Sequence, residues 1–264
     1  MRAIWKGAIS FGLVHIPVRV YAATEDHDIR FRLIHDVCGT PIRYVKYCDS
    51  CGRAVEAEEI VRAYEYEPGR FVPVTEEDMA ALPIPEAKVI RIIEFVSLAD
   101  IDPVYYDRSY FLEPAEGGER PYALLRAALL DSGRVAIARS VLRARESLAA
   151  VRVYAGRALM MDTMYWPDEV RPWAGLRGLD APVTFSPDEQ RLAMTLVDAL
   201  TGPFRPESHR DTYREAVQEL VANKLAGREV VTAPRPEEVP LANLIEALRA
   251  SVAELQTRGG PPVQ

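Results

Sequence analysis

All three cysteines of this chain lie close to a histidine in one short segment, with spacings that suit a metal site. His35 and Cys38 form H-x2-C-G, and Cys48 and Cys51 form C-x2-C-G. Three thiolates and one imidazole are the donor set of a closed, tetrahedral structural Zn2+ site. The glycine after each pair lets backbone amides turn toward the sulfurs. The segment therefore predicts a zinc-ribbon-like hairpin over residues 35–52, with a strand at IRYVKY between the pairs.

Other uses of these cysteines stay open. C-x2-C is also the spacing of thioredoxin-like redox centres, but those occur in a βαβ context that is not evident around Cys48. The thiols could also be free of metal. A catalytic zinc is disfavoured because it needs an open coordination position and a nearby base. Three cysteines cannot form a closed disulfide set, so a reducing cytoplasm is the expected compartment.

The second feature with chemical potential is the arginine-rich stretch 134–157, in which Glu146 is the only acid. Protein that binds duplex DNA without reading its sequence needs cations placed against phosphates. In an unbroken strand Arg139, Arg143 and Arg145 share one face, which predicts a phosphate-facing rim. The alternative is a solvated arginine face. Weaker candidates for phosphate contact are Arg134, Lys6, Arg2, Arg43 and Lys46.

The formal net charge of −7 over 264 residues has the wrong sign for a nucleic-acid binder. The acids, however, concentrate outside the arginine-rich stretch, at residues 56–59, 76–78 and 237–238. A local field governs contact, whereas net charge governs solubility and long-range steering. A protein-interaction scaffold that never contacts DNA remains an alternative, and the negative charge is its main support. No apolar run is long enough to span a membrane.

Enzymatic motifs are not found. The sequence holds no G-x-x-x-x-G-K-[ST], no H-E-x-x-H and no G-x-S-x-G. His15 and His27 stand alone in their segments, which is typical of packed or hydrogen-bonded histidines. Asp100 and Asp102 could suggest paired metal ligands, but their apolar neighbours and the following proline favour a cap between a strand and a turn. A zinc-containing nuclease or ligase-like enzyme would need a carboxylate cluster, and none is convincing.

Up to about residue 180 the hydrophobic pattern indicates many short strands, typical of a barrel or a sandwich. Thr75 begins a capped helix within this region, and Pro121 and Gly133 are expected to bound another. Trp5 and Trp166 are expected to anchor core packing rather than to stack on bases. The clearest strand candidates are residues 14–20, 89–95, 151–154 and 159–165.

From Ser186 onward the pattern becomes helical. An N-cap serine, a proline and two acids begin one amphipathic helix, and residues 209–226 form a second that Gly227 ends. These helices could pack on their own barrel or on a second copy of the chain. Residues 228–240 read as a proline-rich linker before a last short helix, which is either docked back or held for a partner. Its apolar stripe includes Leu241, Leu244, Ile245 and Leu248.

Several blocks in colinear order resemble the bacterial Ku family. They include RAIWKGAISFGLVHIPV at residues 2–18, GRVAIARSVLRARE from Gly133 to Glu146, and MDTMYWPDEVR at residues 161–171. The segment PLANLIEALRASV, which begins at Pro240, resembles the tail by which bacterial Ku proteins engage ligase D.

The resemblance implies an α+β fold with a β-barrel core over residues 1–185, a helical dimerisation arm over 186–227 and a partner-binding helix over 241–257. It implies a nucleoid-associated homodimeric ring and not an enzyme. Such a ring threads onto double-stranded DNA ends without sequence preference, slides inward and bridges the ends. It then recruits the ATP-dependent DNA ligase D for double-strand break repair by non-homologous end joining. In this family context zinc is expected to stabilise the fold.

Overall fold

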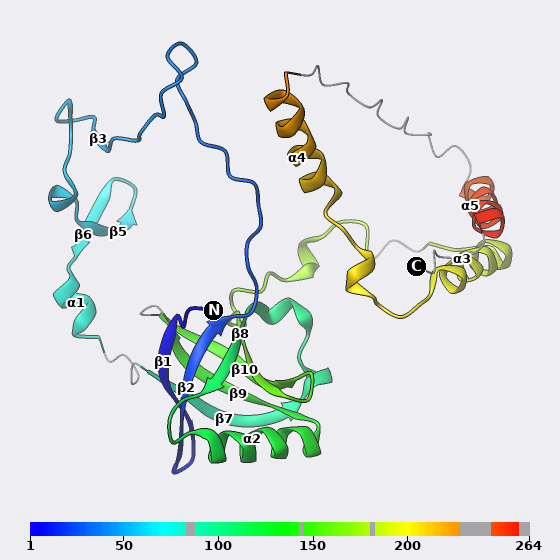
Figure 1. Ribbon diagram of the computed structural model, residues 1–264, viewed down its shortest axis with the longest axis horizontal. Coiled ribbons are helices and arrows are strands. Elements are labelled where there is room, and N and C mark those ends of the chain that lie inside the picture. Colours follow the sequence, from blue (N-terminus) through cyan, green and yellow to red (C-terminus); the bar gives the residue numbers. More distant parts are fainter. Residues whose placement is uncertain (83–87, 143–144, 180–182, 228–243, 259–264) are drawn as a thin grey trace. The chain divides into compact units, whose positions relative to one another are not determined.

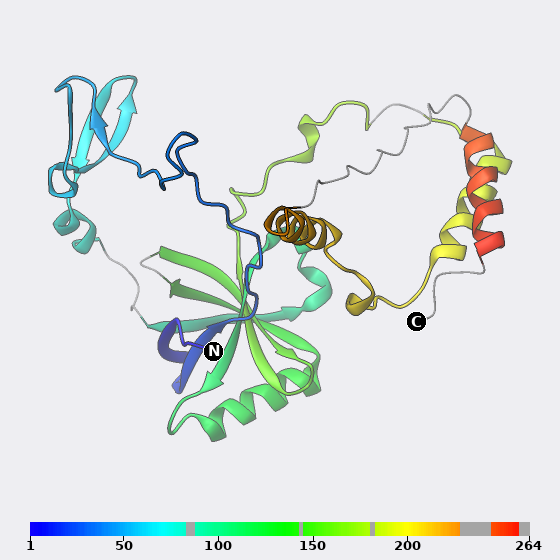
Figure 2. The same ribbon diagram turned by 45° about the horizontal axis from the view of Figure 1, so that its top comes forward.

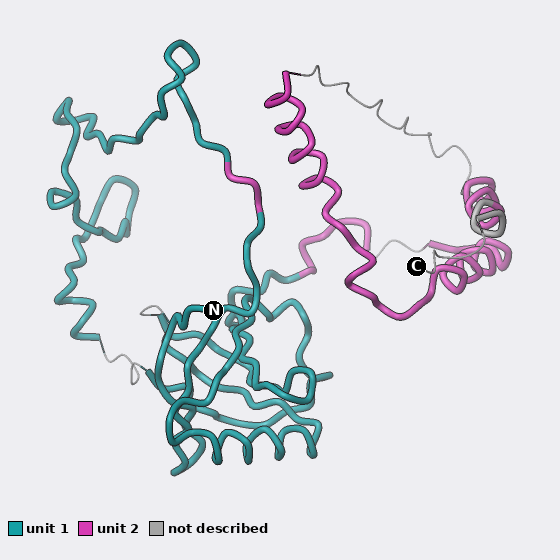
Figure 3. Tube along the Cα trace, viewed as in Figure 1, with its two compact units in different colours: residues 1–27, 31–172 teal, residues 28–30, 173–264 magenta. Residues whose placement is uncertain are grey.

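The computed structural model describes residues 1–82, 88–142, 145–179, 183–227 and 244–258 (Figure 1). The chain divides into two compact units (Figure 3). The first comprises residues 1–27 and 31–172, and the second comprises residues 28–30 and 173–264. Among the described helices, none is long and apolar enough to cross a membrane.

Seven strands of the described chain form a closed barrel in the order β1-β2-β8-β11-β10-β9-β7. Neighbouring strands are antiparallel except where β7 pairs with β1, and this parallel pair closes the barrel. The predicted α+β class with a barrel core is therefore confirmed, and the sandwich alternative is wrong. The strands are β1 (Trp5–Phe11), β2 (Val14–Ala22), β7 (Val89–Ser97), β8 (Tyr106–Pro114), β9 (Arg134–Leu142), β10 (Arg145–Tyr154) and β11 (Ala158–Met164).

The interior of the barrel is filled by alternate apolar side chains from all seven strands. Ile16, Val18 and Val20 of β2 are fully or almost fully buried, as the period of two in this segment predicts. Leu159 and Met161 of β11 join the same cluster. Trp5 packs against this core, as predicted.

Helix α2 (Glu119–Ser132) covers one end of the barrel (Figure 1). Its Tyr122 hydroxyl donates to the carbonyl of Leu112 and accepts from the N–H of Leu159, both over 2.7 Å. These partners are paired residues of β8 and β11, so the tyrosine satisfies backbone groups within the ladder. Gly133 ends the helix with a φ of 62°, as predicted. The helix begins two residues before Pro121, so that proline does not open it.

A buried ion pair lies on the outer face of the barrel. Arg152 of β10 donates from Nε to Oδ2 of Asp162 of β11 over 2.6 Å, and the Asp162 side chain is only 3% exposed. The hydroxyl of Ser109 donates to the other oxygen of Asp162 over 2.5 Å. Burial, together with the charge of Asp162, raises the pKa of Tyr106. Both faces of β11 are therefore covered, one by apolar and the other largely by polar contacts.

The chain leaves the barrel after β2 and returns at β7, and the segment between them is called here the excursion (residues 23–88). Its elements are β3 (Tyr47–Cys48), β4 (Arg53–Ala54), η1 (Ala57–Glu59), β5 (Arg62–Glu67), β6 (Arg70–Val74) and α1 (Glu76–Ala80). Strand β3 pairs with β4, and β5 pairs with β6. The expected strand at IRYVKY is wrong: only Tyr47 of that run is in a strand, because the rest has no partner strand in the described structure.

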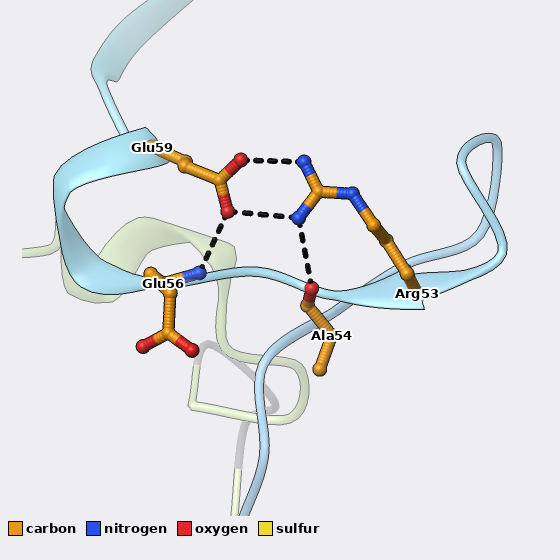
Figure 4. A network of polar contacts seen from close by, with 4 residues as sticks. All are labelled: Arg53, Ala54, Glu56 and Glu59. Carbon is orange, nitrogen blue, oxygen red and sulfur yellow. Dashed lines mark hydrogen bonds and ion pairs between the residues drawn. The ribbon is translucent and has the colours of Figure 1, made fainter.

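Local polar contacts organise the excursion where apolar burial is scarce. Arg53 and Glu59 form a two-point ion pair, with 2.5 and 2.9 Å between their atoms (Figure 4). The same carboxylate accepts the N–H of Glu56, and Arg53 also donates to the carbonyl of Ala54. This network fixes η1 beside the β3–β4 hairpin. The capping box predicted at Thr75 is confirmed, since its hydroxyl accepts from the N–H of Asp78.

The second unit is helical. Its elements are η4 (Trp173–Gly175), α3 (Pro187–Leu200), η5 (Pro206–Ser208), α4 (Thr212–Leu225) and α5 (Leu244–Arg258). The predicted N-cap at Ser186 is confirmed, and Ser186 and Glu189 form a capping box at the start of α3. Helix α4 begins at Thr212 because Asp211 accepts the N–H of Arg214, which places the start later than periodicity alone suggested. Gly227 follows α4 with a φ of 66°, as predicted.

Candidate nucleic-acid interface

The end of the barrel opposite α2 is hollowed. The hollow has a volume of about 320 Å3 and is formed where β8 and β10 begin and where β9 and β11 end. Arginine, carboxylate and aromatic side chains meet there, which is a surface chemistry suited to polar, charged ligands. Its lining residues are Asp107, Arg108, Tyr110, Leu142, Arg145, Ser147, Thr163, Met164, Tyr165, Trp166 and Glu169.

Arg145 is held at this open end by Glu169. Its Nη2 donates to Oε1 of Glu169 over 2.6 Å, and the other oxygen, Oε2, accepts the N–H of Trp166 over 2.8 Å. The backbone N–H of Trp166 and the guanidinium of Arg145 both favour the charged carboxylate, so the pKa of Glu169 lies below its ordinary value. Arg145 nevertheless remains 71% exposed and can reach an external anion.

Arg139 lies beside the same aromatic residue. Its guanidinium carbon is 5.7 Å from the ring centroid of Trp166, within cation–π range. Its Nη1 is 3.7 Å from Oε1 of Glu146, an ion pair too long for a hydrogen bond. Trp166 is half-buried and supports an arginine, and neither cluster of buried residues in the described structure includes it, so its predicted packing role stays a prediction.

The prediction that Arg139, Arg143 and Arg145 share a face of one unbroken strand is wrong in its geometry. Strand β9 ends at Leu142 and β10 begins at Arg145. Leu142 pairs with Arg145 and Leu148 with Arg139, so the two described arginines lie on opposite faces of the β9–β10 ladder. Trp166 links them, because its ring lies against Arg139 and its N–H donates to Glu169, which also pairs with Arg145. Arg143 lies outside the described residues.

The other predicted cations are not gathered at the open end. Arg134 lies at the opposite end of β9, where it lines an apolar groove with α2. Lys6 is exposed on β1, opposite Arg19 of β2. Arg2, Arg43 and Lys46 are exposed outside the barrel strands. The structure thus brings only some of the predicted phosphate-binding cations together at the open end of the barrel.

Sequence reasoning missed two arginines near this surface. Arg108 lines the hollow beside Arg145. Arg91 of β7 lies opposite Arg139 on the neighbouring strand β9. The alternation of residues 89–95 could have placed Arg91 on an outer face, but its strand partner is set by barrel order, which sequence periodicity does not report.

The four predicted metal ligands form two pairs. Nδ1 of His35 lies 3.1 Å from Sγ of Cys38. Cys48 and Cys51 interact through their thiols, and the N–H and thiol of Cys51 lower the pKa of Cys48. Across the part of the chain that the structure describes, no three His, Cys, Asp or Glu side chains form a group able to hold a metal ion. The donor types fit zinc, and joining the two pairs would complete a tetrahedral set.

Each pair sits in the same kind of backbone turn. The N–H of Gly39 donates to the carbonyl of His35 over 2.8 Å, and the N–H of Gly52 donates to that of Cys48 over 2.9 Å. Both glycines have positive φ, 65° and 63°, which is the conformation expected after each ligand pair.

The stripe of the last helix is partly covered by α3. Helices α5 and α3 lie side by side in the views of Figure 1 and Figure 2. Ile245 and Leu248 of α5 are half-buried, and so are Leu192 and Leu196 of α3. Docking back, one of the two alternatives for this helix, is therefore what the structure displays. Leu241 and the linker 228–240 lie outside the described residues, and the side chain of Leu244 is not described.

The remaining sequence candidates have structural roles. Asp102 accepts the N–H of Val104 over 2.9 Å at the start of η3 (Pro103–Tyr105). Asp100 accepts the N–H of Ser97, so both acids cap turns as predicted. His15 is exposed on β2 opposite Ser10.

Comparisons with known proteins agree with this architecture. The family model described as the Ku70/Ku80 beta-barrel domain matches residues 10–194. The non-homologous end joining protein Ku of Symbiobacterium thermophilum is 51% identical over 96% of this chain, which spans 63% of that relative's length. The proteins of the same name from Heliobacterium modesticaldum and Bacillus subtilis are 43% and 41% identical, and the matches cover 98% and 96% of this chain and 94% and 82% of theirs.

Among solved structures, the SPOC domain of human PHD-finger protein 3 is similar at a TM-score of 0.29 and 12% identity over 62% of this chain and 95% of that domain, a likeness that plays no part in the assignment. The barrel and the family model coincide over most of the chain, and the relatives match it almost throughout. The chain therefore belongs to the bacterial Ku family of non-homologous end joining proteins.

Proposed function

We propose that this protein binds double-stranded DNA ends without sequence preference and acts in break repair by non-homologous end joining. The observation that carries the proposal is the match of the family model to the closed barrel, together with relatives named for this process. The action is topological: the protein threads onto an end, slides inward and bridges two ends. It needs a positive lining and no catalytic group.

Exposed apolar side chains support assembly of two copies into a ring. Soluble monomers rarely expose large contiguous apolar surface. In the excursion Val37 is 87% exposed, Tyr44 86% and Tyr64 69%. On α4, Tyr213 is 77% exposed and Leu225 84%. A second copy is the proposed cover for both regions, with α3 and α4 as the dimerisation arm.

The open barrel end supports binding through the DNA backbone. Arg139 and Arg145 are more than half exposed and are held in place by Trp166 and Glu169. Arginine forks suit phosphate oxygens and need not read bases. If six to ten phosphates are contacted, affinity should fall by about 10³–10⁵ between about 50 and 200 mM salt.

Helix α5 is the proposed docking segment for the ATP-dependent DNA ligase D. Its apolar side chains at helical spacing form a stripe suited to a hydrophobic groove. Ile245 and Leu248 are the described members of that stripe, and Leu241 and Leu244 complete it in sequence.

Zinc is the proposed stabiliser of the excursion. The metal would be bound by His35, Cys38, Cys48 and Cys51, and it would supply a cross-link between two hairpin turns that the described structure leaves as separate pairs. Such a link would matter there because few side chains of the excursion are buried.

The test uses one plasmid in covalently closed and linear forms at moderate salt. Linear DNA with bound protein is then recircularised with a ligase. The expected result is binding to the linear form alone, with protein trapped on the circle after closure. Equal binding to both forms would contradict the ring and indicate a protein that binds DNA on an open surface. Binding to neither form would favour a protein-interaction scaffold, consistent with the net charge of −7.

A further inference from the structure

Arg139 and Arg145, the two arginines proposed to contact DNA, each have a carboxylate partner. We propose that Glu146 and Glu169 compete with DNA phosphates for Arg139 and Arg145, and so weaken end binding and its dependence on salt. This inference rests on the proposed binding of DNA at this end of the barrel. It assigns the two acids a role in setting affinity in addition to their local contacts.

The two ion pairs are built so that the cation can leave and the anion stays. The side chains of Arg145 and Arg139 are 71% and 54% exposed, whereas those of Glu169 and Glu146 are 33% and 27% exposed. Glu169 is also anchored by the N–H of Trp166. An arginine can therefore swing toward a phosphate while its carboxylate remains fixed to the protein.

For an arginine, leaving its carboxylate for a DNA phosphate costs little free energy. Exposed ion pairs contribute about 0–1 kcal/mol, because solvent screens them and ordering two side chains opposes them. The Arg139–Glu146 pair is weak by its geometry as well, at 3.7 Å. Oε1 of Glu146 is buried and has no hydrogen-bond partner among the described residues. Arg139 thus keeps donors available, and Trp166 holds its guanidinium near the barrel end.

The carboxylates left behind act against the bound DNA. Each phosphate neutralised by a protein cation adds about 0.9 to the slope of log affinity against log salt. A fixed carboxylate next to that cation cancels part of the neutralisation and repels the phosphate. Removing the carboxylate should therefore steepen the salt dependence and strengthen binding at low salt.

The experiment measures affinity for a short blunt-ended duplex across salt concentrations, using full-length Glu169→Gln and Glu146→Gln. Each is expected to bind roughly two- to fivefold more tightly near 50 mM salt, with a slope steeper by up to about one. Glutamine keeps a carbonyl oxygen that can accept the Trp166 N–H. The two variants are independent, so loss of folding in one leaves the other as the test.

Asp188→Asn is the matched control. Asp188 pairs with Arg191 on α3 over 2.5 Å, and its replacement changes the net charge by the same amount in the second compact unit. Unchanged binding by this control, with tighter binding by the two glutamine variants, supports competition at the barrel end. An equal gain in all three would overturn it, since net charge alone would then explain the effect.

Arg139→Gln and Arg145→Gln separate this inference from the proposed function. If these two arginine variants bind DNA as tightly as wild type, DNA does not contact this end of the barrel. If they weaken binding while Glu146→Gln and Glu169→Gln change neither affinity nor slope, DNA binds there and the competition fails.

Discussion

Arg152 and Asp162 form an ion pair across two neighbouring strands, and the carboxylate is almost completely enclosed by protein. Replacing only the arginine would leave a buried, uncompensated charge, which Ser109 alone cannot satisfy. Arg152→Leu is therefore expected to lower the free energy of unfolding by about 3 kcal/mol, measured by urea denaturation. Arg157→Leu, at the exposed β10–β11 turn, is the control and should change stability little.

The double variant Arg152→Leu/Asp162→Leu tests whether the unpaired buried charge causes the loss of stability. It should recover most of the loss, because no charge is left without a partner. If the double variant is as unstable as the single one, packing by the arginine stem is responsible instead.

Acid titration should reveal the contribution of Glu169. Its pKa is below the ordinary value of 4.5 because the Trp166 N–H and Arg145 stabilise the carboxylate. The folded state therefore binds fewer protons than the unfolded state near that pH. The resulting stabilisation is present above about pH 4.5 and is lost as the pH falls through the lower folded pKa.

Urea unfolding of wild type and Glu169→Gln across this pH range measures the effect. The difference in stability should be constant near neutral pH and should narrow below pH 4.5. Glu116→Gln, at an exposed position in the connection from β8 to α2, is the control. A difference that keeps its full size in acid contradicts this explanation.

The packing of α5 on α3 predicts that the last helix is held before a partner arrives. Leu196→Asp places a charge in this contact and should release α5. Amide hydrogen exchange of residues 244–258 is then expected to be faster than in wild type. Val197→Asp is the matched control, because its side chain is 58% exposed on α3.

Affinity for ligase D should rise in the same Leu196→Asp variant, since its proposed docking stripe no longer has to leave α3. Fast exchange of α5 already in wild type would show that the contact does not hold the helix.

Zinc content is the direct test of the paired cysteines. Protein purified without chelator should contain about one zinc per chain, and Cys38→Ser or Cys51→Ser should reduce it. Ser50→Ala, between Cys48 and Cys51, is the control and should retain the metal. Less than about half an equivalent in wild type would contradict the site and return the redox and metal-free alternatives.

Much of the barrel could be predicted from local pattern. The alternation in β2, the strand over residues 89–95 and the caps at Thr75 and Ser186 depend on neighbouring residues, and the structure confirms them. A register shift between Ile92 and Glu94 interrupts the alternation of β7. The grouping of Arg139 and Arg145 with Trp166 and Glu169 could not be predicted in this way, because it depends on strand order and on the end of β9 at Leu142. A period-two pattern cannot show where one strand ends and the next begins when arginines recur at even-numbered spacings through the whole segment 139–145.

The parallel pairing of β7 with β1 also determines how this chain can reach its native state. Ala8 lies opposite Val89, and the whole excursion separates them in sequence. Closing so long a loop is entropically costly, so the last seam of the barrel should form late and slowly. Until it does, the uncovered aromatic residues of the excursion are available for wrong associations. Dilute, cold refolding should therefore recover more protein than concentrated, warm refolding, and the rate-limiting step should involve strands far apart in the chain.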